Sequence, residues 1–416
     1  MNVTITPTAL CGAVTPPPSK SQSHRLLIAA ALAEGESFVD NLAHSQDIDA
    51  TICCLKALGA QFTPEGGGMR VKGLGAGTAS RRFAQDLPHL DCGESGSTLR
   101  FLIPVALMLR GGGVFTGRGR LMERPLEPYF QLFQEKGISY ELKDGVLTVR
   151  GELTPGEYRL PGNVSSQFFT GLLFALPFLP GPSNLISTTP LESGDYIAMT
   201  LEALGAFGVV FPTTLSRPPQ YLLPGNQVCR SARVAVEGDW SGAAFWYAAA
   251  FLGCDVDVRG LNKASLQGDM RILSFCEKLR GEGPVELDVS ECPDLVPPLA
   301  AMAALRAGEA TRIVNAERLR IKESDRLSAV TDVLSALGAQ VVERPDRLLI
   351  QGQRLLRGGA TVESHNDHRI AMMAAIAAIG CLESVTILGG ECVKKSYPTF
   401  WEEYAALGGR FEVSEP

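Results

Sequence analysis

The sequence predicts an α/β (α+β) protein built from six copies of one βαβαββ unit. Three observations predict this fold: six Ala- and Leu-rich segments that each end at glycine, a β-rich run after each segment, and an amphipathic helix after each run. The 416 residues divide into six units of about 70 residues each. The composition, 45% hydrophobic and 20% charged, is that of a globular protein with two or three domains.

The six apolar segments are predicted to be buried helices, because each opens with small polar or charged residues and closes at glycine. Their apolar stretches are shorter than the roughly 20 residues that a membrane span needs, so we expect core helices and no membrane contact. The segments are residues 19–35, 94–111, 165–181, 239–253, 292–308 and 366–380.

Predicted strands surround these helices. β-rich runs follow them at 37–42, 114–119, 184–190, 255–260, 311–316 and 384–390, and short strands precede them at 2–7, 90–93, 157–162, 232–238, 285–289 and 360–364. The amphipathic helices end at Gly59, Gly137, Gly205, Gly281, Gly338 and Gly408. After most of these glycines the apolar period changes to two, and Asp144-Gly145 predicts a hairpin turn.

The net charge and the cysteine pattern indicate which ligands and which cellular compartment to expect. A formal net charge of -7 predicts no binding to nucleic acid or to acidic membranes, so any anion must bind in a local basic pocket. Ten scattered cysteines without a CxxC pair indicate reduced thiols, and the first residues lack the pattern of a signal peptide. We therefore expect a cytoplasmic protein.

The starts of the predicted buried helices indicate an anionic ligand. Free N–H groups and the positive end of the helix dipole favour anions there, and Lys20, Arg25, Arg100 and Arg369 add positive charge. Ordinary capping explains the polar residues about equally well, and only the cations favour a ligand with several negative charges. His365 and His368 lie three apart without further ligands, so we expect no metal site.

Nine segments identify a family. PSKSQSHR, DCGESGSTLR, MERPLEPY, GNVSSQF, SGDYI, CPDLVPPLA, RIKESDR, NDHR and KKSYP resemble, in the same order, successive segments of the EPSP synthases and span nearly the whole chain. The resemblance implies two similar domains, each with three βαβαββ units around buried parallel helices, and an active site in the cleft between them. It places the first domain at 19–237, on the shikimate 3-phosphate side. Residues 1–18 and 238–416 form the second, with the catalytic carboxylates and phosphoenolpyruvate.

The resemblance also implies an activity. Members of the family transfer the carboxyvinyl group of phosphoenolpyruvate to the 5-hydroxyl of shikimate 3-phosphate, through a tetrahedral intermediate, in the sixth step of the shikimate pathway to chorismate. The reaction requires no metal and no cofactor. The resemblance further implies a monomer, small-molecule substrates only, and a target of glyphosate.

Two carboxylates are the expected acid–base pair. Taken alone, Asp294 is most simply a helix cap and Glu323 a surface charge. The resemblance instead makes Asp294 the base at the 5-hydroxyl and Glu323 the proton donor and acceptor at the methylene carbon, with Lys20 sharing the proton work. Two carboxylates in different environments can divide such roles.

The substrate-binding residues are also carried over from the resemblance, although each alone is more simply a cap or a solvated charge. For shikimate 3-phosphate they are Lys20, Ser21, Arg25, Ser165, Ser166, Gln167, Ser193, Tyr196, Asp294 and Lys322. For phosphoenolpyruvate they are Lys20, Glu94, Gly96, Arg124, Gln167, Arg326, Arg369 and Lys395.

One position departs from the family pattern. Glu94 stands where the family usually has Asn, so a free carboxylate there predicts weaker inhibition by glyphosate. Pairing of Glu94 with Lys20 or Arg124 would remove that effect.

Two other classes compete with this interpretation. The sister enzyme that acts on UDP-N-acetylglucosamine normally carries a reactive cysteine, but no cysteine lies between Cys92 and Cys229. A non-catalytic anion- or RNA-binding repeat protein is disfavoured by the acidic net charge and by the presence of both Asp294 and Glu323.

Overall fold

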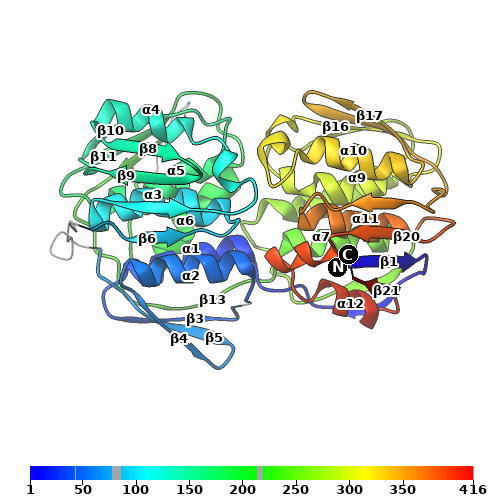
Figure 1. The fold of residues 1–416 in the computed structure, drawn as a ribbon, viewed down its shortest axis with the longest axis horizontal. Helices are drawn as coiled ribbons and strands as arrows, with labels where there is room; N and C mark the ends of the chain where they lie inside the picture. Colours follow the sequence, from blue (N-terminus) through cyan, green and yellow to red (C-terminus); the bar gives the residue numbers. More distant parts are fainter. Residues whose placement is uncertain (43, 77–85, 213–218, 416) are drawn as a thin grey trace. The chain divides into compact units, whose positions relative to one another are not determined.

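The computed structural model describes residues 1–42, 44–76, 86–212 and 219–415 (Figure 1). The chain divides into two compact units. One combines Met1–Pro17 with Gly238–Pro416, and the other is Pro18–Glu237. Each unit has its own hydrophobic core and mixes helices with sheets, which confirms the predicted α/β class.

The unit Pro18–Glu237 begins with the buried helix α1. Its helices are α1 (Lys20–Leu32), α2 (Gln46–Ala57), α3 (Gly96–Arg110), α4 (Glu127–Lys136), α5 (Ser166–Leu173) and α6 (Gly194–Ala206). Its strands are β3 (Glu36–Asp40), β4 (Gln61–Glu65), β5 (Gly68–Lys72), β6 (His89–Asp91), β7 (Gly112–Thr116), β8 (Ser139–Lys143), β9 (Val146–Arg150), β10 (Gly156–Leu160), β11 (Ser183–Ser187), β12 (Gln220–Leu223) and β13 (Arg233–Ala235).

The other unit takes two strands from the start of the chain, β1 (Asn2–Thr6) and β2 (Cys11–Val14). Its helices are α7 (Trp240–Phe251), α8 (Ile272–Arg280), α9 (Val296–Ala304), α10 (Arg326–Ala336), α11 (His368–Ala378) and α12 (Phe400–Ala406). Its remaining strands are β14 (Asp255–Val258), β15 (Val285–Asp288), β16 (Ala310–Val314), β17 (Gln340–Arg344), β18 (Arg347–Gln351), β19 (Thr361–Glu363), β20 (Val385–Leu388) and β21 (Arg410–Ser414). Short 3-10 turns η4 (Gly268–Arg271), η5 (Pro293–Leu295), η6 (Glu317–Ile321) and η7 (Gly390–Lys395) connect them.

The predicted repeat is visible in the strand pairing. In four sheets a buried helix connects two parallel neighbours: β6–α3–β7, β10–α5–β11, β15–α9–β16 and β19–α11–β20. A parallel pair requires such a crossover, because a tight turn cannot join strands that run in the same direction. The other two parallel pairs, β13 with β3 and β14 with β2, join strands from distant parts of the chain.

The crossover helices form the cores. Every residue of α11 is buried, and the described residues of α3 are buried except Ser97 and Arg110. A helix that is apolar on all sides must be surrounded by protein, which explains the Ala- and Leu-rich composition of these segments. In one core α3 packs against α5, and in the other α9 packs against α7 and α11.

One predicted helix is shorter than expected. Residues 165–181 were expected to form a single helix, but α5 ends at Leu173 and only a 3-10 turn, Leu176–Phe178, follows. Pro177 explains the break, because it cannot donate a backbone hydrogen bond and its ring would collide with the carbonyl of Leu173.

The hairpin prediction is confirmed. β8 and β9 pair in antiparallel register around Asp144 and Gly145, whose φ angles are 50° and 74°. Left-handed conformations at both central residues are the requirement of a tight two-residue turn.

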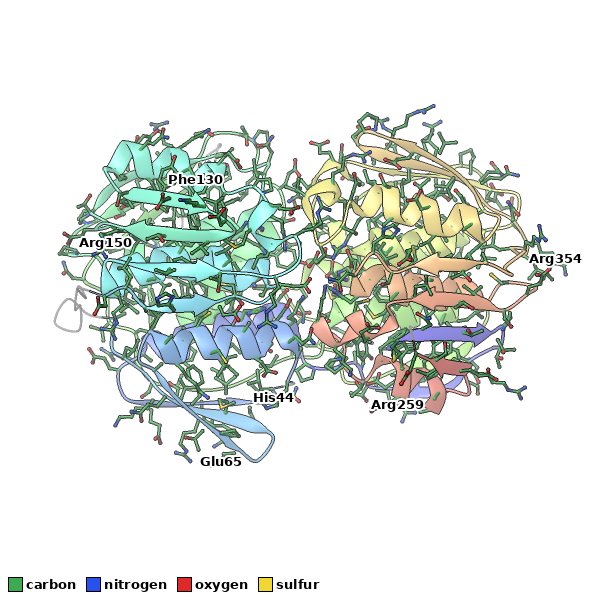
Figure 2. All side chains as sticks on the ribbon, viewed as in Figure 1. His44, Glu65, Phe130, Arg150, Arg259 and Arg354 are labelled. Atoms are coloured by element: carbon green, nitrogen blue, oxygen red, sulfur yellow. The ribbon has the colours of Figure 1, made fainter. Side chains whose placement is uncertain are left out.

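The surface carries the polar residues. Charged side chains such as those of Glu65, Arg259 and Arg354 are exposed and extend outward from the ribbon (Figure 2). Within the described part of the chain, no helix is both long and apolar enough to cross a membrane.

Candidate active site

Serines cap three buried helices in the unit Pro18–Glu237. The hydroxyls of Ser19, Ser95 and Ser165 accept hydrogen bonds from the backbone N–H groups of Gln22, Thr98 and Gln167, at 3.4, 3.1 and 3.3 Å. Each cap satisfies one of the N–H groups at its helix start. The helix starts nevertheless keep further N–H groups and a positive dipole end, which favour anions.

Arg25 is a buried cation of α1 that several groups hold in place. Its Nε donates to Thr200 Oγ1 at 2.9 Å and its Nη2 to the carbonyl of Tyr196 at 2.9 Å. The guanidinium also lies 5.3 Å from the ring centroid of Phe101. Burial lowers the pKa of Arg25 to about 10, partly offset by Tyr196, so the group stays charged at neutral pH. These contacts join α1 to α6 and hold a fixed positive charge.

Lys20 lies at the start of α1 and pairs with a residue that sequence analysis did not single out. Its Nζ is 2.9 Å from Oδ2 of Asp47, and both side chains are largely buried. Asp47 lies in the first turn of α2, where an acidic residue is common, so its sequence position carried no special signal.

Gln167 links the starts of α3 and α5. Its Oε1 accepts from Nη1 of Arg100 at 2.7 Å, and its Nε2 donates to Ser97 Oγ at 3.0 Å. A second nitrogen of Arg100 donates to the carbonyl of Pro125 at 3.0 Å. Arg100 thus fixes which end of the Gln167 amide is oxygen, and it orients a residue that the resemblance assigns to both substrates.

Arg124 lies directly over Gly96. A Cβ added at Gly96 would be 2.6 Å from Nη1 and 2.9 Å from Cζ of Arg124. Only glycine at the first residue of α3 therefore leaves room for this guanidinium. Arg124 is 9% exposed and precedes Pro125, which favours the extended backbone that it adopts.

Glu94, which departs from the family pattern, lies just before the start of α3. Its Oε2 lies beside Gly119, where an added Cβ would be 2.8 Å away, and its charge helps to raise the pKa of Arg118 after the larger effects of Asp91. The carboxylate therefore faces the loop that carries Gly119 and Arg118.

Ser193 precedes α6 in a left-handed conformation, with a φ of 55°. Such a conformation is uncommon for residues other than glycine and costs free energy, so it persists only where the surroundings impose it. The Tyr196 N–H donates to the Ser193 carbonyl at 3.2 Å, and Tyr196 also contacts Arg25. Both expected residues thus lie at one helix start.

In the other unit, one buried arginine donates hydrogen bonds to three carboxylates. Arg326, 1% exposed, donates to Asp294 at 2.8 Å, to Glu323 at 2.7 Å and to Asp367 at 2.7 Å. Arg369 approaches Asp294 at 3.1 Å, and Lys322 lies 3.9 Å from it. Five residues expected from the sequence, Asp294, Lys322, Glu323, Arg326 and Arg369, therefore form one cluster.

The simpler interpretations of the two carboxylates are wrong. Asp294 lies inside η5 and caps neither η5 nor α9, for which no side-chain cap exists. Glu323 is 17% exposed and paired, so it is not a surface charge. Lys322 and Glu323 occupy the short connection between η6 and α10, from which Glu323 reaches Arg326 and Lys322 approaches Asp294.

The cluster shifts the pKa values of its members. Burial alone would raise the pKa of Asp294, but the charges of Arg369, Lys322 and Arg326 outweigh burial and hold it well below its usual value. Burial lowers the pKa of Lys322 to about 8, against the opposing effect of Asp294. Asp294 is consequently ionised at neutral pH, whereas Lys322 can lose its proton at a modest free-energy cost.

Asp367 supports the cluster and was missed by sequence analysis. It is 0% exposed, caps α11 by accepting from the Arg369 N–H at 3.0 Å, and accepts from Ser324 Oγ at 3.0 Å. A role as helix cap already explains an aspartate in the NDHR segment, so no sequence signal pointed to its additional contact with Arg326.

Lys395 lies near the same helix start. Its Nζ donates to the carbonyl of Asn366 at 2.6 Å, and Asn366 and His365 both have a φ of 52°. Lys395 is therefore held at the residue that precedes Asp367. Among the residues that the structure describes, no group of three His, Cys, Asp or Glu side chains could hold a metal ion.

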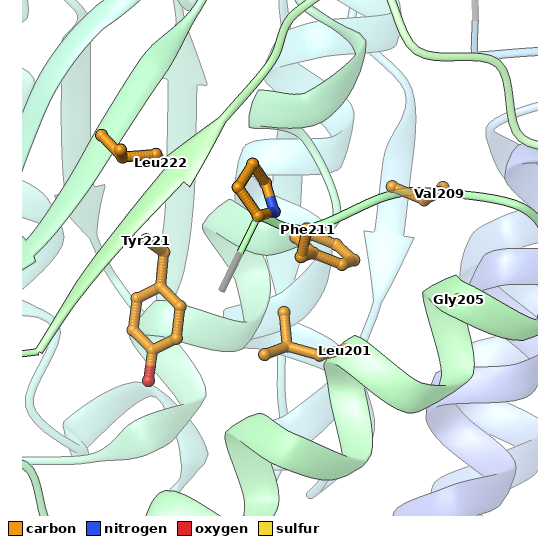
Figure 3. A pocket seen from close by; sticks show the side chains of 7 residues that line it. Leu201, Gly205, Val209, Phe211, Tyr221 and Leu222 are labelled. Atoms are coloured by element: carbon orange, nitrogen blue, oxygen red, sulfur yellow. The ribbon is translucent and has the colours of Figure 1, made fainter. Parts of the chain in front are cut away.

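A separate cavity lies away from these polar groups. It has a volume of about 490 Å³ and is lined by residues of α6, β12 and the intervening chain, including Leu201, Phe211 and Tyr221 (Figure 3). The described residues that line it are mostly apolar and include no cation, so these walls do not suit the anionic ligand that the helix starts favour.

Comparison with known proteins identifies the family. The family model described as EPSP synthase (3-phosphoshikimate 1-carboxyvinyltransferase) matches residues 5–404. The chain belongs to the EPSP synthase family. Proteins named 3-phosphoshikimate 1-carboxyvinyltransferase from Clostridium acetobutylicum and Clostridium beijerinckii are 45% and 42% identical to it. The alignments cover 98% and 99% of this chain and 97% and 98% of the relatives.

Solved structures of enolpyruvyl transferases are similar to this chain. The structure of EPSP synthase from Acinetobacter baumannii has a TM-score of 0.81 and 25% identity, and the match covers 100% of both chains. The enolpyruvyl transferase NikO from Streptomyces tendae, at 16% identity and a TM-score of 0.77, shows the same fold. These similarities confirm both the family expected from the nine sequence segments and the α/β fold class.

Proposed function

We propose that this chain transfers the carboxyvinyl group of phosphoenolpyruvate to the 5-hydroxyl of shikimate 3-phosphate, releasing phosphate and 5-enolpyruvylshikimate 3-phosphate. Membership of the family and the printed names of relatives 45% and 42% identical support this activity. The observation that carries it is the cluster around Arg326, where two carboxylates suited to proton transfer lie among three cations.

The addition needs two proton transfers and the elimination needs one. In the addition, the 5-hydroxyl loses its proton as its oxygen bonds to C2 of phosphoenolpyruvate, and the methylene carbon gains a proton to become a methyl group. In the elimination, the C2–O bond to phosphate breaks and the methyl group loses a proton. One base and one acid–base group are therefore sufficient.

We assign Asp294 to the 5-hydroxyl and Glu323 to the methylene carbon, with Lys20 sharing the proton work. Asp294 is ionised but weakly basic while Arg369 and Arg326 contact it. The carboxylate and phosphate of phosphoenolpyruvate would compete for the same guanidinium groups. Binding of that substrate would then raise the basicity of Asp294 when it is needed.

The cations provide the phosphoenolpyruvate site in this proposal. Arg326 and Arg369 place two buried positive charges beside Asp294, and Arg124 and Lys395 add further positive charge. Arginine forks suit carboxylate and phosphate oxygens, and they also stabilise charge that develops on the departing phosphate. Glu94, Gly96, Gln167 and Lys20 complete the proposed set.

The starts of α1, α5 and α6 provide most of the shikimate 3-phosphate site, so we assign the unit that contains residues 19–237 to this substrate. Serine hydroxyls, helix N–H groups and Arg25 offer donors to the phosphate. The proposed residues are Lys20, Ser21, Arg25, Ser165, Ser166, Gln167, Ser193 and Tyr196, with Asp294 and Lys322 from the other unit.

The physiological setting follows from the activity and the charge. We propose a cytoplasmic monomer whose partners are its two small-molecule substrates, without nucleic acid or membrane binding, and whose turnover requires no metal or other cofactor. The net charge of -7 supports the absence of nucleic-acid binding.

Measuring phosphate release from phosphoenolpyruvate with each candidate acceptor tests the proposed function. We expect release with shikimate 3-phosphate, none with UDP-N-acetylglucosamine, and full activity in excess chelator. Release with the nucleotide sugar alone would identify the sister activity, and activity that is lost in chelator and restored by a divalent ion would contradict the metal-free proposal.

A further inference from the structure

Three buried side chains, those of His24, Thr51 and Thr98, form a polar link that none of the proposed roles uses. Nδ1 of His24 lies 2.7 Å from Oγ1 of Thr51, which in turn lies 2.6 Å from Oγ1 of Thr98. Thr98 then donates to the hydroxyl of Ser95 at 2.7 Å. All four side chains are at most 1% exposed, so their polar groups depend on one another for hydrogen bonds. The link joins α2 to α1 and α3, the two helices that α2 packs against (Figure 1).

The first part of the link lies one helical turn along from Lys20 and Asp47. His24 follows Lys20 by four positions in α1, and Thr51 follows Asp47 by four positions in α2. Residues four positions apart share one face of a helix. The hydrogen bond of the link therefore lies next to the 2.9 Å ion pair between the lysine and the aspartate. Thr51 also donates to the carbonyl of Asp47 at 3.3 Å, so it holds the backbone that carries the carboxylate.

The other end of the link reaches the start of α3. Ser95 caps this helix, because its hydroxyl accepts from the Thr98 N–H at 3.1 Å as well as from the Thr98 hydroxyl. Gly96, the next residue, lies against the guanidinium of Arg124. A displacement of this helix start would move Gly96 and change the space that is left for Arg124.

The imidazole of His24 suits this position because it is neutral. Burial lowers the pKa of His24 well below its usual value, and the charges of Lys20 and Arg25 act in the same direction. A neutral ring does not repel Lys20 one turn away, so it can hold α1 against α2 at this point. The ring also meets Phe101 of α3 edge-on, with 6.3 Å between the ring centroids.

We propose that Thr51 is a positioning residue for the transfer reaction, whose hydroxyl fixes Lys20 of α1 and Gly96 of α3 at the separation that phosphoenolpyruvate requires. This inference rests on the proposed function, in which both residues belong to the phosphoenolpyruvate site. Thr51 does not touch the reacting atoms in this scheme and acts through His24 and Thr98. Most residues assigned to shikimate 3-phosphate belong to the starts of α5 and α6, so the binding of that substrate should change little.

Thr51→Val tests this role, because valine has nearly the same shape and lacks the hydroxyl. We expect the KM for phosphoenolpyruvate to rise about 5–10-fold, the size of one lost hydrogen bond, while the KM for shikimate 3-phosphate stays within about twofold. Thr51→Ser keeps the hydroxyl and should keep both KM values within about twofold of the wild type. A loss of folded protein alone would lower the apparent kcat at unchanged KM values, so this comparison separates positioning from stability.

Thr311→Val is the matched control for the loss of a buried hydroxyl. Thr311 is 1% exposed, and its hydroxyl has no hydrogen-bond partner among the described residues. Both KM values of this variant should equal those of the wild type. Thr98→Val removes the next contact of the link and should also raise the KM for phosphoenolpyruvate, which keeps the test decisive if Thr51→Val does not fold.

Chemical labelling of Lys20 provides a readout that needs no turnover. Acetic anhydride acetylates uncharged amines, and mass spectrometry of peptides measures how fast each lysine is modified. Lys20 should be acetylated about threefold faster in Thr51→Val than in the wild type, because its ion pair with Asp47 is no longer held in place. Lys143, an exposed lysine of β8, should react at the same rate in both proteins.

These readouts separate the outcomes. A KM for phosphoenolpyruvate that neither Thr51→Val nor Thr98→Val changes would overturn the proposed role of Thr51, and so would a rise that Thr51→Ser shares. If the wild type does not convert shikimate 3-phosphate and phosphoenolpyruvate, the proposed function fails, while the labelling of Lys20 still shows whether Thr51 holds this lysine.

Discussion

Gly96→Ala is expected to disturb one cation and little else. A Cβ at residue 96 would lie 2.6 Å from Nη1 of Arg124, about 1 Å closer than ordinary van der Waals contact. Its nearest neighbours are the three outer atoms of this guanidinium, the far end of a flexible side chain. The guanidinium should therefore move by about 1 Å, and the fold should change in stability by less than about 1 kcal/mol.

The size of the effect on substrate binding follows from that displacement. Hydrogen bonds to a charged group contribute about 1.5–3 kcal/mol each. A shift of about 1 Å would forfeit roughly 1–2 kcal/mol of the contact between Arg124 and phosphoenolpyruvate, which corresponds to a rise in KM of about 5–30-fold. The KM for shikimate 3-phosphate should change by less than about twofold.

A double-mutant cycle shows whether the effect acts through Arg124. In an Arg124→Ala background, Gly96→Ala should change the KM for phosphoenolpyruvate by less than about twofold, because the displaced group is absent. Gly205→Ala is the control: residue 205 is an exposed position of α6, and an added Cβ would meet nothing within 4 Å. Equal effects of Gly96→Ala in both backgrounds would refute the reasoning.

Three further changes are predicted from the same contacts. Asp294→Ala should lower kcat by about 10²–10⁴-fold while shikimate 3-phosphate binding, measured by calorimetry, stays nearly intact; near-normal turnover would remove Asp294 from the mechanism. Glu94→Asn should lower the Ki for glyphosate by about fivefold, from roughly 1 kcal/mol of repulsion relieved, and an unchanged Ki would show that Arg118 already screens the carboxylate. Asp367→Ala should lower the free energy of unfolding in urea by about 3–5 kcal/mol, because the buried Arg326 loses one of its carboxylate partners. A decrease of less than about 1 kcal/mol would contradict this prediction.

The sequence was sufficient to predict the repeat and most of its elements. Apolar periodicity and terminal glycines located the crossover helices, since a helix such as α11 must be apolar on every side when strands surround it. The break after Leu173 was missed because Pro177 was counted within an apolar run, although its missing N–H ends the helix.

The candidate site was less predictable from the residues alone. Asp294 and Glu323 came from the family resemblance, since local pattern favoured a cap and a surface charge. Asp294 meets Arg326 across 32 positions of the chain, which no local period encodes, and Glu323 joins them from only three positions before Arg326. Asp47 was missed because an aspartate at a helix start needs no partner to be explained.

The proposed addition and elimination can be tested directly by following deuterium into the substrate. The wild type is incubated with phosphoenolpyruvate in deuterium oxide, with and without shikimate 3-phosphate, and C3 of the recovered phosphoenolpyruvate and of the product is examined by mass spectrometry. The account predicts deuterium at C3 only when shikimate 3-phosphate is present, because the methylene carbon becomes a methyl group in the tetrahedral intermediate. Phosphate release and product formation without any deuterium at C3 would contradict it.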